Sequence, residues 1–106
     1  MLDQERLEIG ERAILVSLDF GERDFFDGTQ EFVQLVESAN ILPLAQISGK
    51  RSRPDAKYYA GTGKVQEIAE AIRAYDANLV LFNHALTPAQ ERNLERQLSC
   101  RVLDRT

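Results

Sequence analysis

Residues 13–18 read Ala-Ile-Leu-Val-Ser-Leu, a short and nearly continuous apolar run. A strand with one solvent-exposed face would alternate apolar and polar side chains, and this run does not alternate. Continuous apolar strands are typical of parallel sheets that are covered by helices on both faces. This stretch therefore predicts an α/β fold with a strand that is buried on both sides.

The segment that follows predicts a helix and then an edge strand. Residues 32–39 carry apolar side chains at the spacing of one helical face, and Asp27 with Gln30 would cap that helix. Residues 41–47 indicate a second strand. Pro43 has no N–H to give to a neighbouring strand, so we expect strand 41–47 at an edge of the sheet.

The second half of the chain repeats this alternation. Residues 65–72 predict a helix, and residues 79–82 predict a strand. Residues 87–90 read Thr-Pro-Ala-Gln, in which the threonine can cap a helix, the proline suits its first turn and the glutamine can close a capping box. We expect this helix to reach Leu98 and to be followed by a short strand at residues 101–103.

The predicted element order is β-α-β-α-β-α-β in a single domain of residues 1–106. Helices between successive strands imply right-handed crossovers, so we expect an open, four-stranded parallel sheet with three helices on its two faces. The expected strand order is 2-1-3-4. The sequence stops directly after the last strand, and we interpret the chain as a fragment of a larger protein.

Composition limits the classes of function. Apolar residues make up 43% and charged residues 28%, as in a soluble globular domain. We expect no membrane segment, because the longest apolar run is too short to span a bilayer, and we expect no signal peptide, because residues 1–5 are acidic and polar. Cys100 is the only cysteine, which excludes an internal disulfide and favours the cytoplasm. It is expected to be a small buried residue before the last strand.

Charge is concentrated in one place. The net charge is −4, yet residues 50–64, here called the basic segment, contain five cations against Asp55 alone. The cations are Lys50, Arg51, Arg53, Lys57 and Lys64. Tyr58 and Tyr59 lie among them and could stack on bases or pack on the end of the sheet. We interpret the basic segment as a loop that contacts RNA or phosphate. The competing interpretation is that its cations pair with the acidic loop after the first strand.

The basic segment ends in Gly61-Thr62-Gly63-Lys64. A Walker A motif would need glycine where Tyr58 stands and a Ser or Thr where Val65 stands, so this is not a P-loop. The glycines could still let the backbone approach a phosphate at a helix N-terminus. Alternatively, they simply make the turn into the helix.

Other chemistry is less favoured. Four acids after the first strand could hold Mg²⁺, but we expect them to be solvated, and we predict no metal site. They are Asp19, Glu22, Asp24 and Asp27. A receiver-like phosphorylation site would need an aspartate at the end of the third strand, and Asn83 stands there instead. His84, the only histidine, is expected to make a local hydrogen bond. We predict no catalytic residue.

Several motifs together resemble the N-terminal domain of HflX-type GTPases. Residues 50–54 read Lys-Arg-Ser-Arg-Pro, and residues 59–68 read Tyr-Ala-Gly-Thr-Gly-Lys-Val-Gln-Glu-Ile. The resemblance continues at residues 86–95, Leu-Thr-Pro-Ala-Gln-Glu-Arg-Asn-Leu-Glu, and at residues 102–106, Val-Leu-Asp-Arg-Thr. The opening stretch at residues 12–16, with Asp19, fits as well. Each motif alone is weak, but their ordered set is specific.

The resemblance implies a parent protein with helical, GTP-binding and C-terminal domains after this one. Such proteins bind the large ribosomal subunit and its rRNA, split or rescue stalled ribosomes under stress, and use GTP with Mg²⁺. ATP binding has been attributed to the N-terminal region of some members. Three GTP-binding motifs are missing from these 106 residues: the Walker A motif, the Asp-x-x-Gly switch and the Asn-Lys-x-Asp guanine motif. The resemblance therefore assigns GTP hydrolysis to the parent protein and not to this chain.

Three hypotheses follow. The first is a ribosome-binding module whose five cations contact rRNA, with Tyr58 or Tyr59 stacking and with Gly61, Thr62 and Gly63 as a phosphate-approach turn. The second is an adenine-nucleotide-binding domain at that turn. The third is an intramolecular regulator that restrains the GTP-binding domain of the parent chain.

Overall fold

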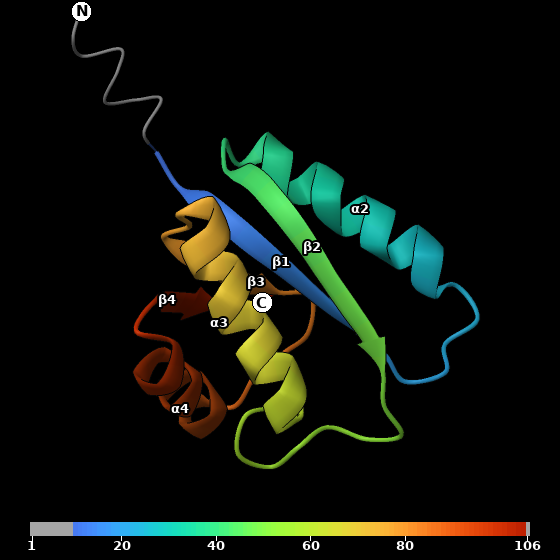
Figure 1. Cartoon of the computed structure of the whole chain (residues 1–106). Coiled ribbons are helices and arrows are strands. Elements are labelled where there is room, and N and C mark those ends of the chain that lie inside the picture. The colour runs from blue at the N-terminus through green and yellow to red at the C-terminus, as the bar shows by residue number, and fades with distance from the viewer. Residues whose placement is uncertain (1–9, 106) are drawn as a thin grey trace, which may run out of the picture.

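The computed structural model describes residues 10–105 and contains four strands and three helices there (Figure 1). In chain order they are β1 (Arg12–Asp19), α2 (Phe25–Ser38), β2 (Leu42–Lys50), α3 (Thr62–Tyr75), β3 (Leu79–Phe82), α4 (Pro88–Leu98) and β4 (Arg101–Leu103). This order confirms the predicted alternation of strands and helices. None of the helices described is long and apolar enough to cross a membrane.

The four strands form one parallel sheet in the order β2-β1-β3-β4, as predicted. The prediction that the Pro43 strand lies at an edge is also confirmed. The register between β1 and β2 shifts by one residue directly after Pro43, because Ala13 pairs with Pro43 and Ile14 pairs with Ala45. A bulge next to an edge proline is a common way to accommodate the missing N–H.

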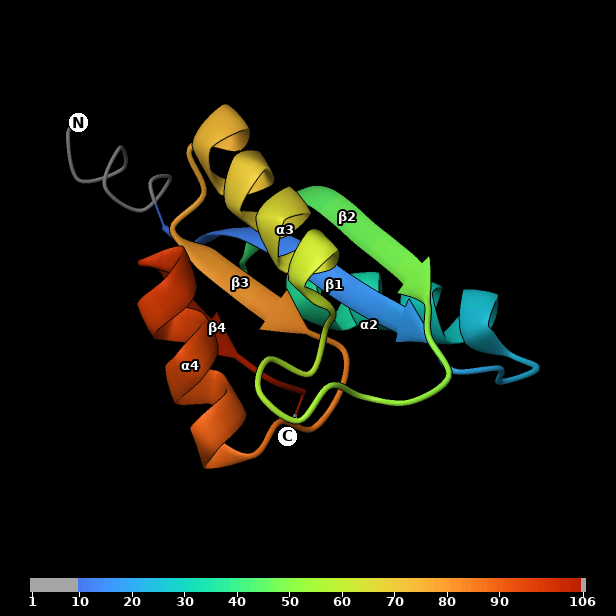
Figure 2. The ribbon, with the colours of Figure 1, turned by 60° about the horizontal axis from the view of Figure 1, so that its bottom comes forward.

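Helices cover both faces of the sheet (Figure 2), and the side chains between them and the sheet form two cores. On one face α2 packs against Ala13, Leu15 and the β3 residues beside them. On the other face α3 and α4 pack against Ile14, Val16 and Leu18. Side chains at residues 13–18 are therefore buried in both directions, which confirms the prediction made from the apolar run.

The ends of the elements differ in part from prediction. The capping box of α4 is present, because the Thr87 hydroxyl accepts from the Gln90 amide at 3.1 Å and Gln90 Oε1 accepts from the Thr87 amide at 3.0 Å. The prediction that Asp27 caps α2 is wrong. The helix begins at Phe25, with Asp24 at the N-cap, so Asp27 falls in the first turn, where its charge still favours the helix dipole. The β2 strand continues to Lys50 because its pairing with β1 extends to Asp19.

Candidate nucleic-acid interface

Three loops meet at the carboxyl edge of the sheet: residues 20–24 after β1, residues 51–61 after β2 and residues 83–87 after β3. The loop after β2 contains most of the basic segment, and Figure 2 shows it crossing toward α4 before it turns into α3. Ligands of open parallel sheets favour this edge, near the point where the strand order reverses. Here that point lies between β1 and β3.

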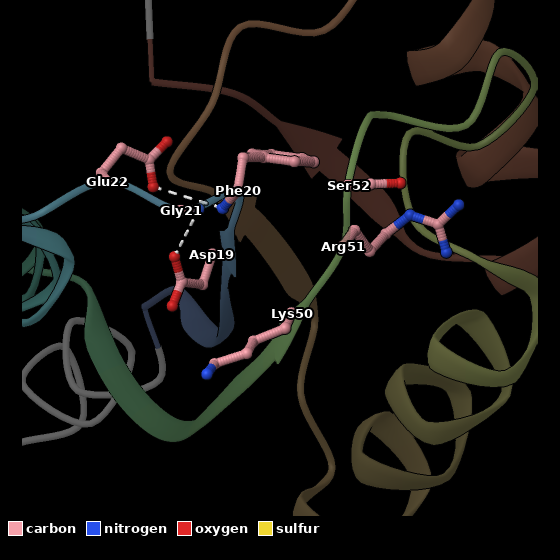
Figure 3. A pocket seen from close by; sticks show the side chains of 7 residues that line it. All are labelled: Asp19, Phe20, Gly21, Glu22, Lys50, Arg51 and Ser52. Carbon is pink, nitrogen blue, oxygen red and sulfur yellow. Dashed lines mark hydrogen bonds between the residues drawn. The ribbon is translucent and has the colours of Figure 1, made fainter.

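A surface hollow of about 420 Å³ lies between the first two loops (Figure 3). Its lining residues are Asp19, Phe20, Gly21, Glu22, Lys50, Arg51 and Ser52. The two acids bind their own loop: Asp19 accepts from the Gly21 amide at 2.8 Å, and Glu22 accepts from the Phe20 amide at 3.3 Å. In Figure 3 the side chains of Lys50 and Arg51 leave the strand end in different directions.

Only one of the five cations of the basic segment pairs with a carboxylate in the part of the chain that the structure describes. Lys64 Nζ lies 2.8 Å from Glu67 Oε1 and also donates to the Ser48 carbonyl at 2.8 Å. The other four, Lys50, Arg51, Arg53 and Lys57, form no ion pair with any carboxylate between Gly10 and Arg105. The pairing with the acidic first loop that we considered from the sequence is not present.

Two glycines make room for two of these cations. The Arg51 guanidinium lies against Gly61, where an added Cβ would overlap Nη1, and Arg51 Nε donates to the Arg53 carbonyl at 3.1 Å. The second glycine is Gly49, where an added Cβ would come within 3.0 Å of Lys64 Nζ. Gly61 has an ordinary φ of −73°, so its backbone does not need glycine, but the missing Cβ gives the Arg51 guanidinium its place.

The tip of the loop is closed by Asp55 and Tyr59. Their backbones exchange two hydrogen bonds of 2.9 Å, and Tyr59 adopts a positive φ of 67°. The Asp55 carboxylate accepts from the amides of Lys57 and Tyr58, both at 2.9 Å. The bond from Tyr58 is the largest cause that lowers the pKa of Asp55 below its usual value. The loop tip is therefore a preformed tight turn.

A row of amide side chains on α4 holds this turn. Gln90 Nε2 donates to the carbonyls of Asp55 and Ala56 at 3.0 and 3.3 Å. Asn93 Nδ2 donates to the Lys57 carbonyl at 3.1 Å, and Gln97 Oε1 accepts from the Tyr58 hydroxyl at 3.3 Å. The sequence analysis missed this row. Its signal was three amide side chains at the i, i+3, i+7 spacing of one helical face.

The two adjacent tyrosines point to different places. Tyr59 packs with Phe20, Phe82 and His84, at ring-centroid distances of 5.8, 6.3 and 5.1 Å. Burial is the main cause that raises the pKa of Tyr59. Tyr58 instead lies beside α4, with Lys57 Nζ 5.2 Å from its ring centroid. Both rings are half-buried and pack against the core between the sheet and α3–α4, but of the two only Tyr59 also contacts other aromatic rings among the described residues.

The predicted local hydrogen bond of His84 is wrong. His84 Nε2 accepts from the backbone amide of Leu18, a residue 66 positions earlier, at 2.8 Å. The neighbouring Asn83 bonds the Ser17 hydroxyl at 3.3 Å and accepts from Arg105 at 3.0 Å. The side chains of Asn83 and His84 therefore join the end of β3 to β1 at the point where the strand order reverses.

The remaining candidates from the sequence are the acidic residues and Cys100. Between Gly10 and Arg105, no three His, Cys, Asp or Glu side chains come together as a metal site. Cys100 is half-buried before β4, and burial is the main cause that raises the pKa of its thiol, so it is a weak nucleophile.

Known proteins identify this architecture. Residues 27–106 match the family described as GTP-binding GTPase N-terminal. The chain is 51% identical over 102 residues to GTPase HflX of Escherichia coli, which covers 96% of this chain and 24% of that protein. It is 37% identical to GTPase HflX of Lacrimispora saccharolytica, again over 96% of this chain and 24% of the relative. The chain belongs to the HflX family and corresponds to its N-terminal domain.

A solved structure shares the fold. The crystal structure of SsGBP in complex with GDP matches with a TM-score of 0.68 at 24% identity, over 89% of this chain and 26% of that one. The present chain spans about a quarter of the length of the HflX relatives that it matches.

Proposed function

We propose that this chain is the ribosome-binding N-terminal domain of a cytoplasmic GTPase that associates with the large ribosomal subunit and splits or rescues stalled ribosomes under stress. Membership of the HflX family supports the GTPase assignment. The observation that carries the RNA assignment is the group of four cations without carboxylate partners, held on a preformed loop at the carboxyl edge of the sheet.

Electrostatics favour a local contact. The chain as a whole has a net charge of −4, so a polyanion gains nothing from its overall charge. The four cations lie within eight consecutive residues that contain one acid, Asp55, whose carboxylate is already occupied by two backbone amides. A phosphate backbone that reaches this loop would release counterions without first breaking an ion pair.

The members of the basic segment take different roles in this proposal. Lys50, Arg51, Arg53 and Lys57 contact rRNA phosphates, and Tyr58 offers its ring. Lys64 and Tyr59 support the loop, because the first is engaged by Glu67 and the second packs among aromatic rings. Gly61, Thr62 and Gly63 bring the backbone close to the ligand. GTP and Mg²⁺ belong to the GTP-binding domain of the parent chain, which is, with the helical domain, the intramolecular partner.

A second candidate is adenine-nucleotide binding at the start of α3. The Arg51 guanidinium lies over Gly61, next to the first-turn amides of that helix, and both groups suit a phosphate. Calorimetry of the 106-residue chain with ATP distinguishes the two candidates. Absence of heat at millimolar ATP would exclude this second one.

The RNA proposal is tested by co-sedimentation of the parent protein with large ribosomal subunits. The triple variant Lys50→Ala/Arg51→Ala/Arg53→Ala should bind more weakly and show a flatter salt dependence, by roughly one unit of log–log slope per lost contact. The matched control, Arg12→Ala/Arg73→Ala/Arg101→Ala, removes the same charge from the amino end of the sheet and from α3. Equal binding by the two triple variants would contradict the proposal.

A further inference from the structure

The Tyr58 ring stands between two hollows on the α3–α4 face of the domain. One hollow, of about 130 Å³, is lined by Tyr58, Thr62, Val65, Gln66 and Gln97. The other, of about 200 Å³, is lined by Lys57, Tyr58, Asn93, Arg96 and Gln97. Both lie away from the hollow at the ends of β1 and β2, so the structure divides the basic segment into two surfaces.

Two cations lie beside Tyr58, and the Asp55 carboxylate near them is occupied by the amides of Lys57 and Tyr58. Lys57 and Arg96 are exposed and form no ion pair with a carboxylate in residues 10–105. The residues that line the two hollows include no acid, and their other polar side-chain groups are two hydroxyls and three amides. Cations suit a phosphate, an aromatic ring suits the face of a base, and amide side chains suit base edges.

The Tyr58 ring is held in one orientation before any ligand arrives. Its hydroxyl donates to Gln97 Oε1 at 3.3 Å, and its amide donates to the Asp55 carboxylate at 2.9 Å. The preceding carbonyl, of Lys57, accepts from Asn93 at 3.1 Å. A ring that is already fixed loses little conformational entropy when a base stacks on it.

We infer that Tyr58 is a stacking platform for one unpaired base of single-stranded RNA, with Lys57 and Arg96 on the adjoining phosphates and Gln66 and Gln97 at the base edge. This inference rests on the RNA-binding function proposed above. It adds the α4 surface to the interface, and it specifies the form of RNA. Bases inside a duplex are stacked on one another and cannot stack on Tyr58, which lies in the loop after β2 beside α4.

The test uses the 106-residue chain and a 12-nucleotide RNA of uridines with one central 2-aminopurine, either single-stranded or annealed to its complement. The wild type should bind the single strand more tightly than the duplex and quench the 2-aminopurine emission. Tyr58→Leu should abolish the quenching and weaken single-strand binding about fivefold or more, while duplex binding stays the same. Tyr58→Phe should restore both, because it keeps the ring.

Two further variants locate the site. Lys57→Ala/Arg96→Ala should reduce the log–log salt slope for the single strand by about 1.4 units, or about 0.7 per phosphate contact. Tyr75→Leu is the matched control, since Tyr75 is 51% exposed at the far end of α3. It should bind and quench as the wild type does.

The outcomes separate this inference from the proposed function. If Tyr58→Leu binds and quenches like the wild type while Lys50→Ala/Arg51→Ala/Arg53→Ala loses affinity, the stacking platform is disproved and RNA binding stands. If the wild type binds neither form of the RNA, both are disproved.

Discussion

The imidazole of His84 accepts a hydrogen bond of 2.8 Å from the backbone amide of Leu18, at the end of the buried strand β1. The same ring packs on Tyr59, 5.1 Å away in the loop after β2, and on Phe20, 5.6 Å away in the loop after β1. His84 itself belongs to the loop after β3. One side chain therefore joins all three loops at the carboxyl edge of the sheet, and the shape of the candidate interface depends on it.

The first prediction concerns pH. Only a neutral imidazole can accept from Leu18, and burial is the main cause that lowers the pKa of His84. In the unfolded chain the histidine takes up a proton near pH 6.5. The folded state binds that proton less well, so stability should be fully present above pH 6.5 and should fall as the pH drops toward the lower folded pKa.

Urea unfolding at pH 7.5 and pH 5.5 measures this effect. His84→Ala should be less stable at pH 7.5 and should lose less stability on acidification, because His84 is the only histidine in the sequence. A wild-type chain whose loss of stability between the two pH values equals that of His84→Ala would refute the prediction.

The second prediction concerns the row of amides on α4. Asn93→Ala removes the bond to the Lys57 carbonyl at the surface, so we expect the free energy of unfolding to fall by about 1 kcal/mol or less. The loop tip should open more often. Hydrogen exchange of the Asp55 and Tyr59 amides, which bond each other's carbonyls, should become faster. Arg92→Ala, on the neighbouring exposed position, serves as the control and should leave these two amides protected.

The third prediction concerns Gly61. Alanine fits the backbone there, but its Cβ would displace the guanidinium of Arg51. We expect stability to change by less than about 1 kcal/mol, since Arg51 is flexible, while affinity for single-stranded RNA falls. In the Arg51→Ala background, Gly61→Ala should have no further effect on RNA affinity. Gly28→Ala is the control: nothing lies within 4 Å of its Cβ, and it should stabilise α2 by roughly 0.5–1 kcal/mol.

The fourth prediction separates the two tyrosines by stability. Tyr59→Ala removes a ring that packs against Phe20, Phe82 and His84, so the free energy of unfolding should fall by about 2–3 kcal/mol. Tyr58→Ala should cost less, about 1–2 kcal/mol, because that half-buried ring packs on the core outside the aromatic cluster and loses one hydrogen bond. Urea denaturation monitored by circular dichroism gives both values. Equal costs would mean that the two rings are not in different environments.

The sequence by itself determined the architecture. The unbroken apolar run at residues 13–18 indicated a strand buried on both faces, and Pro43 indicated the edge of the sheet. Thr87 and Gln90 marked the start of α4 at the correct residue. These signals can be recognised in the sequence because they are local. Periodicity, a missing N–H and a capping box each act within a few residues.

Only the tertiary structure decided how the basic segment is folded. The sequence places Tyr58 beside Tyr59, but the positive φ of Tyr59 and the bonds from α4 direct one ring toward α4 and the other into the aromatic cluster. Gln90 reaches a carbonyl 35 residues away, and His84 reaches an amide 66 residues away. An irregular loop has no period to read, and such contacts exist only after the sheet has brought its three loops to one edge.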